Sequence, residues 1–226
     1  MNLFDKSLEY DEMLNKGIAI SGENKQFFIR GRLNDLFNQL PSDIKINRIL
    51  DFGCGIGDSS EVFLNHVPDA LITGTDTSLE AILYAQKHNN HSNRASYLEL
   101  RNFNAFNEFD LCYVNGVFHH IPLDERAKAI KIIYDALKPG GIFALFENNP
   151  LNPGTKLIMS RIPFDRDAIT LYPLETKNLL YQNGFRPPAT TRFLFYFPKS
   201  LSLFRSFEKY LVTVPLGAQY YVMVRK

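Results

Sequence analysis

The amino-acid sequence predicts an α/β fold, in which a doubly wound, mostly parallel sheet lies between two layers of helices. Strand-like apolar runs alternate with helix-like segments from Arg48 to Glu147. The first run stops at a turn that contains three glycines, and the last run follows a Lys-Pro-Gly-Gly turn at residues 138–141. Because such alternation produces parallel strands joined by crossover helices, a ligand is expected at the carboxyl ends of the strands.

The composition narrows the class of protein. With 226 residues, the chain is long enough for one domain with a large core. The formal net charge of +1 provides no electrostatic footprint for nucleic acid. No apolar run reaches ~18 residues and the N-terminus lacks a signal pattern, so we expect a soluble protein without an integral membrane segment. Two cysteines, Cys54 and Cys112, form no disulfide framework and favour a reducing, cytoplasmic setting.

The first elements follow from periodicity and from helix signals. Apolar residues recur at helical spacing from Glu23 to Leu40, which predicts a helix. The run Arg48–Phe52 predicts the first strand, and Asp58–His66 predicts the first crossover helix. Asp58 is expected to cap that helix, with Glu61 completing a pair of the capping-box type.

The later elements are expected to follow the same rules. The expected strands are Ala70–Thr75, Ala95–Leu100, Phe109–Val114, Ile142–Glu147, Thr190–Phe197 and Ala218–Val224, and the expected helices are Ser78–Lys87, Glu125–Leu137, Leu174–Asn183 and Leu201–Val212. Residues 148–173 break the alternation and are rich in proline and asparagine, so we expect an irregular insertion. Such an insertion is more often a functional lid than filler.

The glycine-rich turn after the first strand is the most specific local signal. Gly53, Gly55 and Gly57 alternate with other residues, and glycine allows positive φ angles and close approach of the backbone to a ligand. A dinucleotide fingerprint would need its third glycine where this chain has Asp58. Since a carboxylate repels a pyrophosphate, a cationic or neutral ligand is favoured. A glycine turn without a ligand is the alternative.

In combination, five motifs resemble those of class I S-adenosylmethionine-dependent methyltransferases of the small-molecule type. They are Ile49–Gly57, Asp76 at the end of the second strand, Phe109–Asn115, the His-His-Ile-Pro loop within Val117–Pro122, and Leu137–Gly141. The resemblance covers residues 45 to 226. It implies a three-layer fold around seven strands, of which only the last is antiparallel, and it implies S-adenosylmethionine as the cofactor.

The resemblance also implies which residues contact that cofactor. Asp51 faces its charged end, Gly53 and Gly55 pass beneath its methionine part, and Asp76 accepts hydrogen bonds from the ribose hydroxyls. A helix cap is the alternative role for Asp76. The other expected contacts are Tyr10 over the cofactor, Thr77 and Asn102 at the adenine, and Asn115 at the end of the fourth strand. Related enzymes usually have an aspartate where this chain has Asn102.

The candidates for catalysis are few. Methyl transfer is an in-line displacement that needs mainly alignment and a dry site. A base is required only for a hydroxyl or a protonated amine. The candidates are His119, His120 and Glu147, of which His120 and Glu147 are favoured, and a structural hydrogen bond is the alternative role for His120. Because adjacent histidine side chains are expected to diverge, no metal site is predicted.

The acceptor is expected to be a small molecule. We expect residues 1–44 to form an N-terminal helical cap, 45–147 the cofactor-binding core, 148–173 an acceptor-site insertion and 174–226 the last part of the sheet. The aromatic run Phe193–Phe197 belongs to the core, or it lines an apolar groove for a lipid-linked or aromatic acceptor, or it forms a dimer surface.

The sequence leaves two other functional classes open. One is a protein that binds S-adenosylmethionine, or a partner, on this fold without catalysis. The other is a nicotinamide-dependent oxidoreductase, against which the glycine spacing argues. The methylated atom and the oligomeric state are not specified by the sequence.

Overall fold

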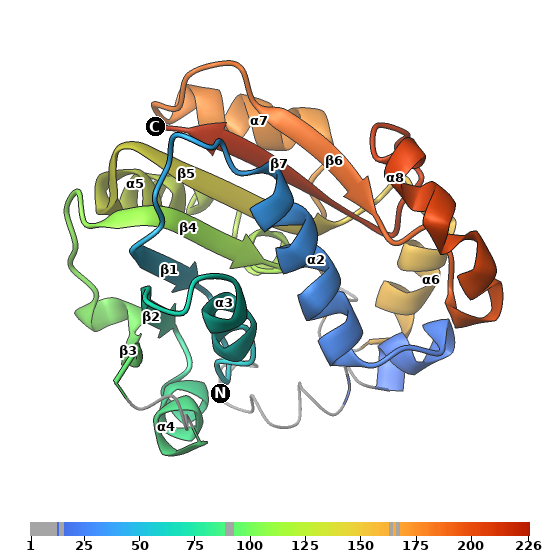
Figure 1. The fold of residues 1–226 in the computed structure, drawn as a ribbon, viewed down its shortest axis with the longest axis horizontal. Helices are drawn as coiled ribbons and strands as arrows, with labels where there is room; N and C mark the ends of the chain where they lie inside the picture. Colours follow the sequence, from blue (N-terminus) through green and yellow to red (C-terminus); the bar gives the residue numbers. More distant parts are fainter. Residues whose placement is uncertain (1–12, 14–15, 89–92, 163–164, 166–167) are drawn as a thin grey trace.

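Seven strands form one sheet in the order β3-β2-β1-β4-β5-β7-β6, with helices on both faces (Figure 1). The computed structural model describes residues 13, 16–88, 93–162, 165 and 168–226. The strands are β1 (Arg48–Phe52), β2 (Leu71–Asp76), β3 (Ala95–Glu99), β4 (Phe109–Asn115), β5 (Leu137–Asn148), β6 (Thr190–Leu194) and β7 (Gln219–Arg225). Strand β7 runs antiparallel to both of its neighbours, whereas β1 to β5 pair in parallel. The predicted fold class is confirmed.

Two layers of helices bury the two faces of this sheet. The helices are α2 (Lys25–Gln39), α3 (Ser60–His66), α4 (Leu79–His88), α5 (Arg126–Ala136), α6 (Pro153–Arg161), α7 (Pro173–Gln182) and α8 (Glu208–Leu211). Leu33 of α2 and Phe63 of α3 pack with strand residues of one face, while Ile130 of α5 and Leu180 of α7 pack with those of the other. All four side chains are fully buried. Helix α4 packs against β2 and β3.

Strands in the centre of the sheet are buried on both faces, which explains their continuous apolar sequences. In β4, every residue from Phe109 to Val114 is buried. Strand β5 begins at Leu137, so the Lys-Pro-Gly-Gly segment expected as a turn is part of the strand. Gly140 has a φ of 81° there, and its amide donates to the carbonyl of Lys226 at 3.0 Å.

The insertion differs from the expectation because it contains a helix. Residues 153–161 form α6, although the whole segment 148–173 was expected to be irregular. The side chain of Asn152 accepts a hydrogen bond from the amide of Thr155, and Pro153 occupies the first turn, where its missing N–H is harmless. An N-cap and an N-terminal proline therefore start a helix in a segment whose composition indicates a loop.

Two further boundaries were wrong. Helix α3 begins at Ser60 with no side-chain cap, and Asp58, the expected cap, forms an ion pair with Lys25 instead. Residues 199–207 form a 3₁₀ segment that leads into the short α8, where a single helix was expected.

The strand order places a crevice at the centre of the sheet. Strand β1 lies between β2 and β4, so the chain first builds outward on one side of β1 through β2 and β3 and then crosses to β4 on the other side. Ligands bind to doubly wound sheets outside the carboxyl ends of the strands at such a switch point. Among the described residues, no helix has the length and apolar character needed to cross a membrane.

Candidate active site

A cavity of about 1320 Å³ opens at the carboxyl ends of β1, β2 and β4. Small-molecule sites commonly measure about 300–1,000 Å³, so this cavity has room for two ligands of moderate size. The glycine turn and acidic side chains line one part of it. Helices α2 and α6, the end of β6 and the His119–His120 loop line the rest.

The glycine turn is anchored to β2 by its own backbone. The amides of Gly53 and Cys54 donate to the carbonyl of Thr75 at 2.7 and 3.0 Å. Gly53 and Gly55 have φ angles of 77° and 53°, in the left-handed region that favours glycine. A Cβ at Gly53 would lie 2.3 Å from Val117, whereas a Cβ at Gly55 would meet nothing within 4 Å. The backbone of Gly55 therefore faces open space in the cavity.

Asp76 ends β2 directly beside this turn. One carboxylate oxygen accepts the amide of Gly55 and the other accepts the amide of Ser78, both at 2.9 Å. Burial raises the pKa of Asp76, and the hydrogen bonds from Ser78 and Gly55 oppose that rise. Since each carboxylate oxygen can accept more than one hydrogen bond, a ligand diol can still be bound. Asp76 thus organises the turn and faces the cavity, and the exposed Thr77 lines the cavity next to it.

Asp51 is a buried carboxylate without a matching cation. It is only 2% exposed, and its Oδ2 has no hydrogen-bond partner among the described residues. Burial raises the pKa of Asp51 to about 8, assisted by the negative charge of Asp76, and Arg32 lowers it only in part. Because Asp51 lines the cavity, a cationic ligand would supply the missing partner.

Arg32 of α2 is buried in the cavity wall, at 5% exposure. Its Nε donates to the hydroxyl of Tyr113 at 3.0 Å, and its Nη1 donates to the side chain of Gln219 at 2.9 Å. This arginine therefore links α2 to β4 and β7.

The other expected cofactor residues have different positions. Asn115, at the end of β4, lines the cavity. Asn102 ends a 3₁₀ turn after β3, is exposed, and is not among the lining residues, because Glu99, Leu100 and Arg101 form the wall at that point. Tyr10 lies outside the described residues.

Two histidines and two carboxylates form a cluster beside the cavity. His119 Nδ1 lies 2.5 Å from Glu147 Oε2, and the amide of Phe118 donates to Glu147 Oε1 at 2.8 Å. Asp165 Oδ1 lies 3.4 Å from His120 Nε2 and 3.7 Å from His119 Nε2. The centroids of the two imidazole rings are 4.1 Å apart, so the side chains converge, contrary to the expected divergence.

The members of this cluster differ in access. His119, His120 and Asp165 line the cavity, whereas Glu147 is only 2% exposed and is not a lining residue. Glu147 therefore supports His119 from behind. Asp165 was missed as an individual site residue, because no local spacing in the sequence relates it to the histidine loop.

The charges of the cluster are strongly coupled. Burial alone would lower the pKa of His119, but the carboxylates of Glu147 and Asp165 outweigh burial and raise that pKa to about 10. Burial likewise opposes ionisation of Asp165, yet the neighbouring imidazoles bring its pKa down to about 2. His119, His120 and Asp165 offer atoms within 4.8 Å of one another, a spacing that a metal ion could bridge. A charged imidazolium, however, has no lone pair for a metal, which favours an ion-pair cluster.

One wall of the cavity is apolar. Phe27 and Phe28 of α2 lie 5.8 and 4.9 Å, centroid to centroid, from the ring of Phe195. Phe195 follows β6 with a φ of 63°, a strained conformation for a bulky residue. Residues 158, 159 and 162, at α6 and its C-terminal end, extend this wall. Backbone strain like that of Phe195 is usually retained where function requires it.

The chain is similar to known methyltransferases. Residues 50–143 match the family profile of a methyltransferase domain. A trans-aconitate 2-methyltransferase of Rhodopseudomonas palustris (strain BisB18) is 29% identical over 138 residues, which cover 58% of this chain and 49% of that protein. A trans-aconitate 2-methyltransferase of Variovorax paradoxus (strain S110) is 31% identical over 99 residues, 43% of this chain and 37% of that protein. The chain thus spans half or less of the length of these two curated relatives.

Solved structures share the fold at low sequence identity. A SAM dependent methyltransferase from Archaeoglobus fulgidus has a TM-score of 0.68 and 14% identity, covering 90% of this chain and 95% of that one. Human N-acetylserotonin methyltransferase, solved in complex with SAM, has a TM-score of 0.65 and 18% identity, covering 96% of this chain and 56% of that one. At these identities the likeness establishes the fold alone.

Proposed function

We propose that this chain, which belongs to the class I S-adenosylmethionine-dependent methyltransferases, transfers a methyl group to a small-molecule acceptor. The observation that carries the proposal is the shape of one cavity. The glycine turn, Asp51 and Asp76 line one part of it, and the His119–His120 loop with Asp165 lines another. Cofactor and acceptor can therefore occupy the same cavity.

The chemistry of the glycine-turn side fits S-adenosylmethionine. The bound cofactor supplies a methyl group on a cationic sulfonium, and it also carries a charged amino group. Asp51, buried and without a partner at Oδ2, would pair with this positive end. Asp76 would accept the ribose hydroxyls, Gly53 and Gly55 would pass beneath the methionine part, and Thr77 would lie at the adenine. We assign Asn115 to the same side of the cavity.

The acceptor side would be served by His120. Its Nε2 faces the carboxylate of Asp165 at 3.4 Å, so a proton taken from an acceptor hydroxyl or ammonium would be stabilised there. Glu147 would act indirectly. It would hold the imidazole of His119 in place, and His119 in turn would offset the negative charge of Asp165. We assign residues 148–173, which include α6 and Asp165, to acceptor binding.

The acceptor would have an apolar body and could be lipid-linked. The aromatic residues Phe27, Phe28 and Phe195 offer a wall for it. Three arginines in the lining already have partners, since Arg32 binds Tyr113, Arg101 pairs with Glu99, and Arg205 pairs with Glu23 at 2.8 Å. Two free cysteines in a chain of this kind support a cytoplasmic location.

Two measurements test the proposal. Calorimetry with S-adenosylmethionine, its demethylated product and a nicotinamide dinucleotide should show binding of the first two only. Transfer of a radiolabelled methyl group is then followed across a panel of apolar phenols, amines and carboxylic acids. Absence of S-adenosylmethionine binding would overturn the proposal. Binding without turnover of any acceptor would favour the non-catalytic alternative.

A further inference from the structure

The mouth of the cavity opens on a surface with many exposed apolar side chains. Three segments form this rim: residues 16–22, 153–161 and 198–211. Ile20 and Leu157 line the cavity and are 53% and 50% exposed, so they lie at its opening. From the third segment, Leu203, Phe207 and Tyr210 are 90%, 56% and 71% exposed. Leu203 and Phe207 belong to the 3₁₀ segment 199–207, and Tyr210 belongs to the short α8 that follows it.

The three segments lie together at one end of the molecule. Figure 1 shows α6, α8 and the chain that precedes α2 side by side. A Cβ at Gly17 would lie 3.7 Å from the side chain of Ile158, and one at Gly22 would lie 2.8 Å from the side chain of Lys199, so the first segment contacts both others. The side chain of Asn152, just before α6, also donates to the carbonyl of Leu216 at 2.6 Å.

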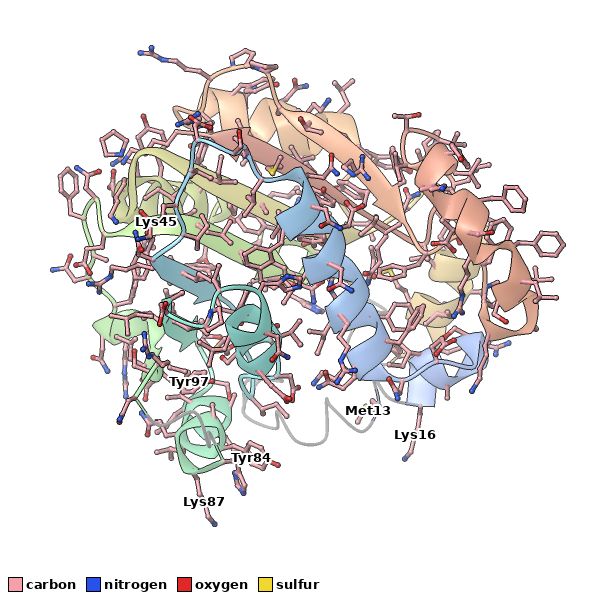
Figure 2. All side chains as sticks on the ribbon, in the orientation of Figure 1. Met13, Lys16, Lys45, Tyr84, Lys87 and Tyr97 are labelled. Atoms are coloured by element: carbon pink, nitrogen blue, oxygen red, sulfur yellow. The ribbon has the colours of Figure 1, made fainter. Side chains whose placement is uncertain are left out.

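The exposed charges of this rim are all of one sign. They are Lys16, Lys156, Arg161, Lys199 and Lys209. The one acidic residue of the three segments, Glu208, is turned inward, where its carboxylate accepts the amides of Tyr196 and Phe197. Figure 2 shows Lys16 pointing away from the protein at this end. The whole chain has a formal net charge of only +1, whereas the exposed charged residues of the rim are all basic. Basic charge is therefore concentrated at the rim.

We propose that this rim docks on a bilayer of anionic phospholipid and that the acceptor enters the cavity from that bilayer. Exposed leucine and aromatic side chains flanked by lysines are the features with which peripheral segments bury an apolar face at the headgroup boundary. Anionic lipids attract such basic residues, and their acyl chains also contact exposed apolar side chains, which a free phosphate cannot do. The inference rests on the proposed function and narrows its acceptor to a lipid-borne amphiphile.

Vesicle co-sedimentation tests the docking. The protein is sedimented with vesicles of phosphatidylcholine and with vesicles that also contain phosphatidylglycerol. We expect binding to the anionic vesicles that weakens as salt is raised, because the basic rim is screened. Leu203→Glu/Phe207→Glu should weaken binding at least about tenfold, and so should Lys199→Glu/Lys209→Glu. The matched control is Phe106→Glu/Leu174→Glu, at positions 70% and 69% exposed and outside the rim.

The possible outcomes distinguish failure of the membrane docking from failure of the proposed function. Equal loss of binding in the rim and control variants, or no binding to either vesicle, would overturn the docking. If the wild-type protein self-associates in sedimentation velocity and the rim variants do not, the rim is an interface between copies instead. Calorimetry with S-adenosylmethionine is run on the same samples. Intact cofactor binding without vesicle binding refutes only the docking, whereas lost cofactor binding in the wild type refutes the proposed function.

Discussion

Single residues at the glycine turn show how two neighbouring carboxylates acquire different roles. Asp76 has a backbone donor on each oxygen, which fixes its orientation and leaves capacity for further hydrogen bonds. Asp51 has an oxygen with no donor and lies deeper in the protein. The first arrangement suits recognition of hydroxyl groups, and the second suits attraction of a positive charge.

Replacing Asp76 should weaken cofactor binding more than it disturbs the fold. For Asp76→Ala we expect the affinity for S-adenosylmethionine to fall at least about tenfold, or ~1.4 kcal/mol, because the ribose hydroxyls lose their acceptor. Isothermal titration calorimetry measures this. Asp69→Ala removes an exposed carboxylate far from the cavity and should leave the affinity unchanged. Unchanged affinity in Asp76→Ala would refute the ribose assignment.

Glu147→Gln should separate turnover from cofactor binding. The substitution keeps the shape but removes one of the two carboxylates that raise the pKa of His119 to about 10, so that pKa should fall. We expect turnover to drop about tenfold, less than the ~10²–10⁴-fold contributed by a group that itself transfers the proton, because Glu147 acts through His119. Cofactor affinity should stay within about twofold. Imidazole NMR reports the His119 titration, and methyl-transfer kinetics report turnover. Parallel losses in turnover and affinity would indicate a purely structural role.

At the scale of elements, the glycine turn requires positive φ angles and, at one position, the absence of a Cβ. Substitutions can separate these two requirements. Gly53 and Gly55 both have positive φ, so an alanine at either position costs about 1–2 kcal/mol. Only at Gly53 does the new Cβ also collide with Val117, at 2.3 Å. Overpacking of that kind adds about 1–3 kcal/mol.

We therefore predict that one alanine variant mainly loses thermal stability and the other mainly loses cofactor affinity. Gly53→Ala should lower the melting temperature clearly more than Gly55→Ala does. In Gly55→Ala the main loss should be cofactor affinity, because the methyl group enters space that the ligand would use. Thermal unfolding without ligand and calorimetry with S-adenosylmethionine check the pair. Equal melting temperatures together with equal affinities would contradict this account of the turn.

The elements also show which structural information is local in the sequence. Strands buried on both faces, such as β1 and β4, were predicted within a residue because their apolar runs are continuous. Helix α6 was missed because its start depends on one cap and one proline rather than on an apolar stripe. The placement of Asp165 beside His120 depends on how the insertion folds back, and no spacing along the chain encodes it.

The whole molecule has an uneven charge distribution that its net charge of +1 conceals. Asp51, Asp58 and Asp76 gather at the cofactor side of the cavity, and exposed lysines gather at its mouth. Without a cationic ligand, the acidic side destabilises the fold, because Asp51 and Asp76 repel each other and Asp51 is buried. Binding sites commonly carry such a cost to stability.

This cost should appear in the pH dependence of unfolding. The pKa of Asp51 is about 8 in the folded protein, and ~3.9 is expected in the unfolded chain. Between these values the folded state binds the extra proton, so the contribution of Asp51 to stability falls as pH rises from about 4 to 8. Asp51→Asn cannot ionise, and it should become progressively more stable than the wild type from pH 5 to pH 8.

Urea unfolding of the ligand-free protein at pH 5, 6, 7 and 8 measures that difference. Asp43→Asn is the control, because Asp43 is exposed beside Arg225 and its pKa is lowered, which makes its effect constant over this range. Saturating S-adenosylmethionine should stabilise the wild type increasingly as pH rises towards 8, since ionised Asp51 then has its partner. A difference between Asp51→Asn and wild type that stays constant with pH would show that Asp51 is ionised throughout, and that the cofactor does not compensate a buried charge.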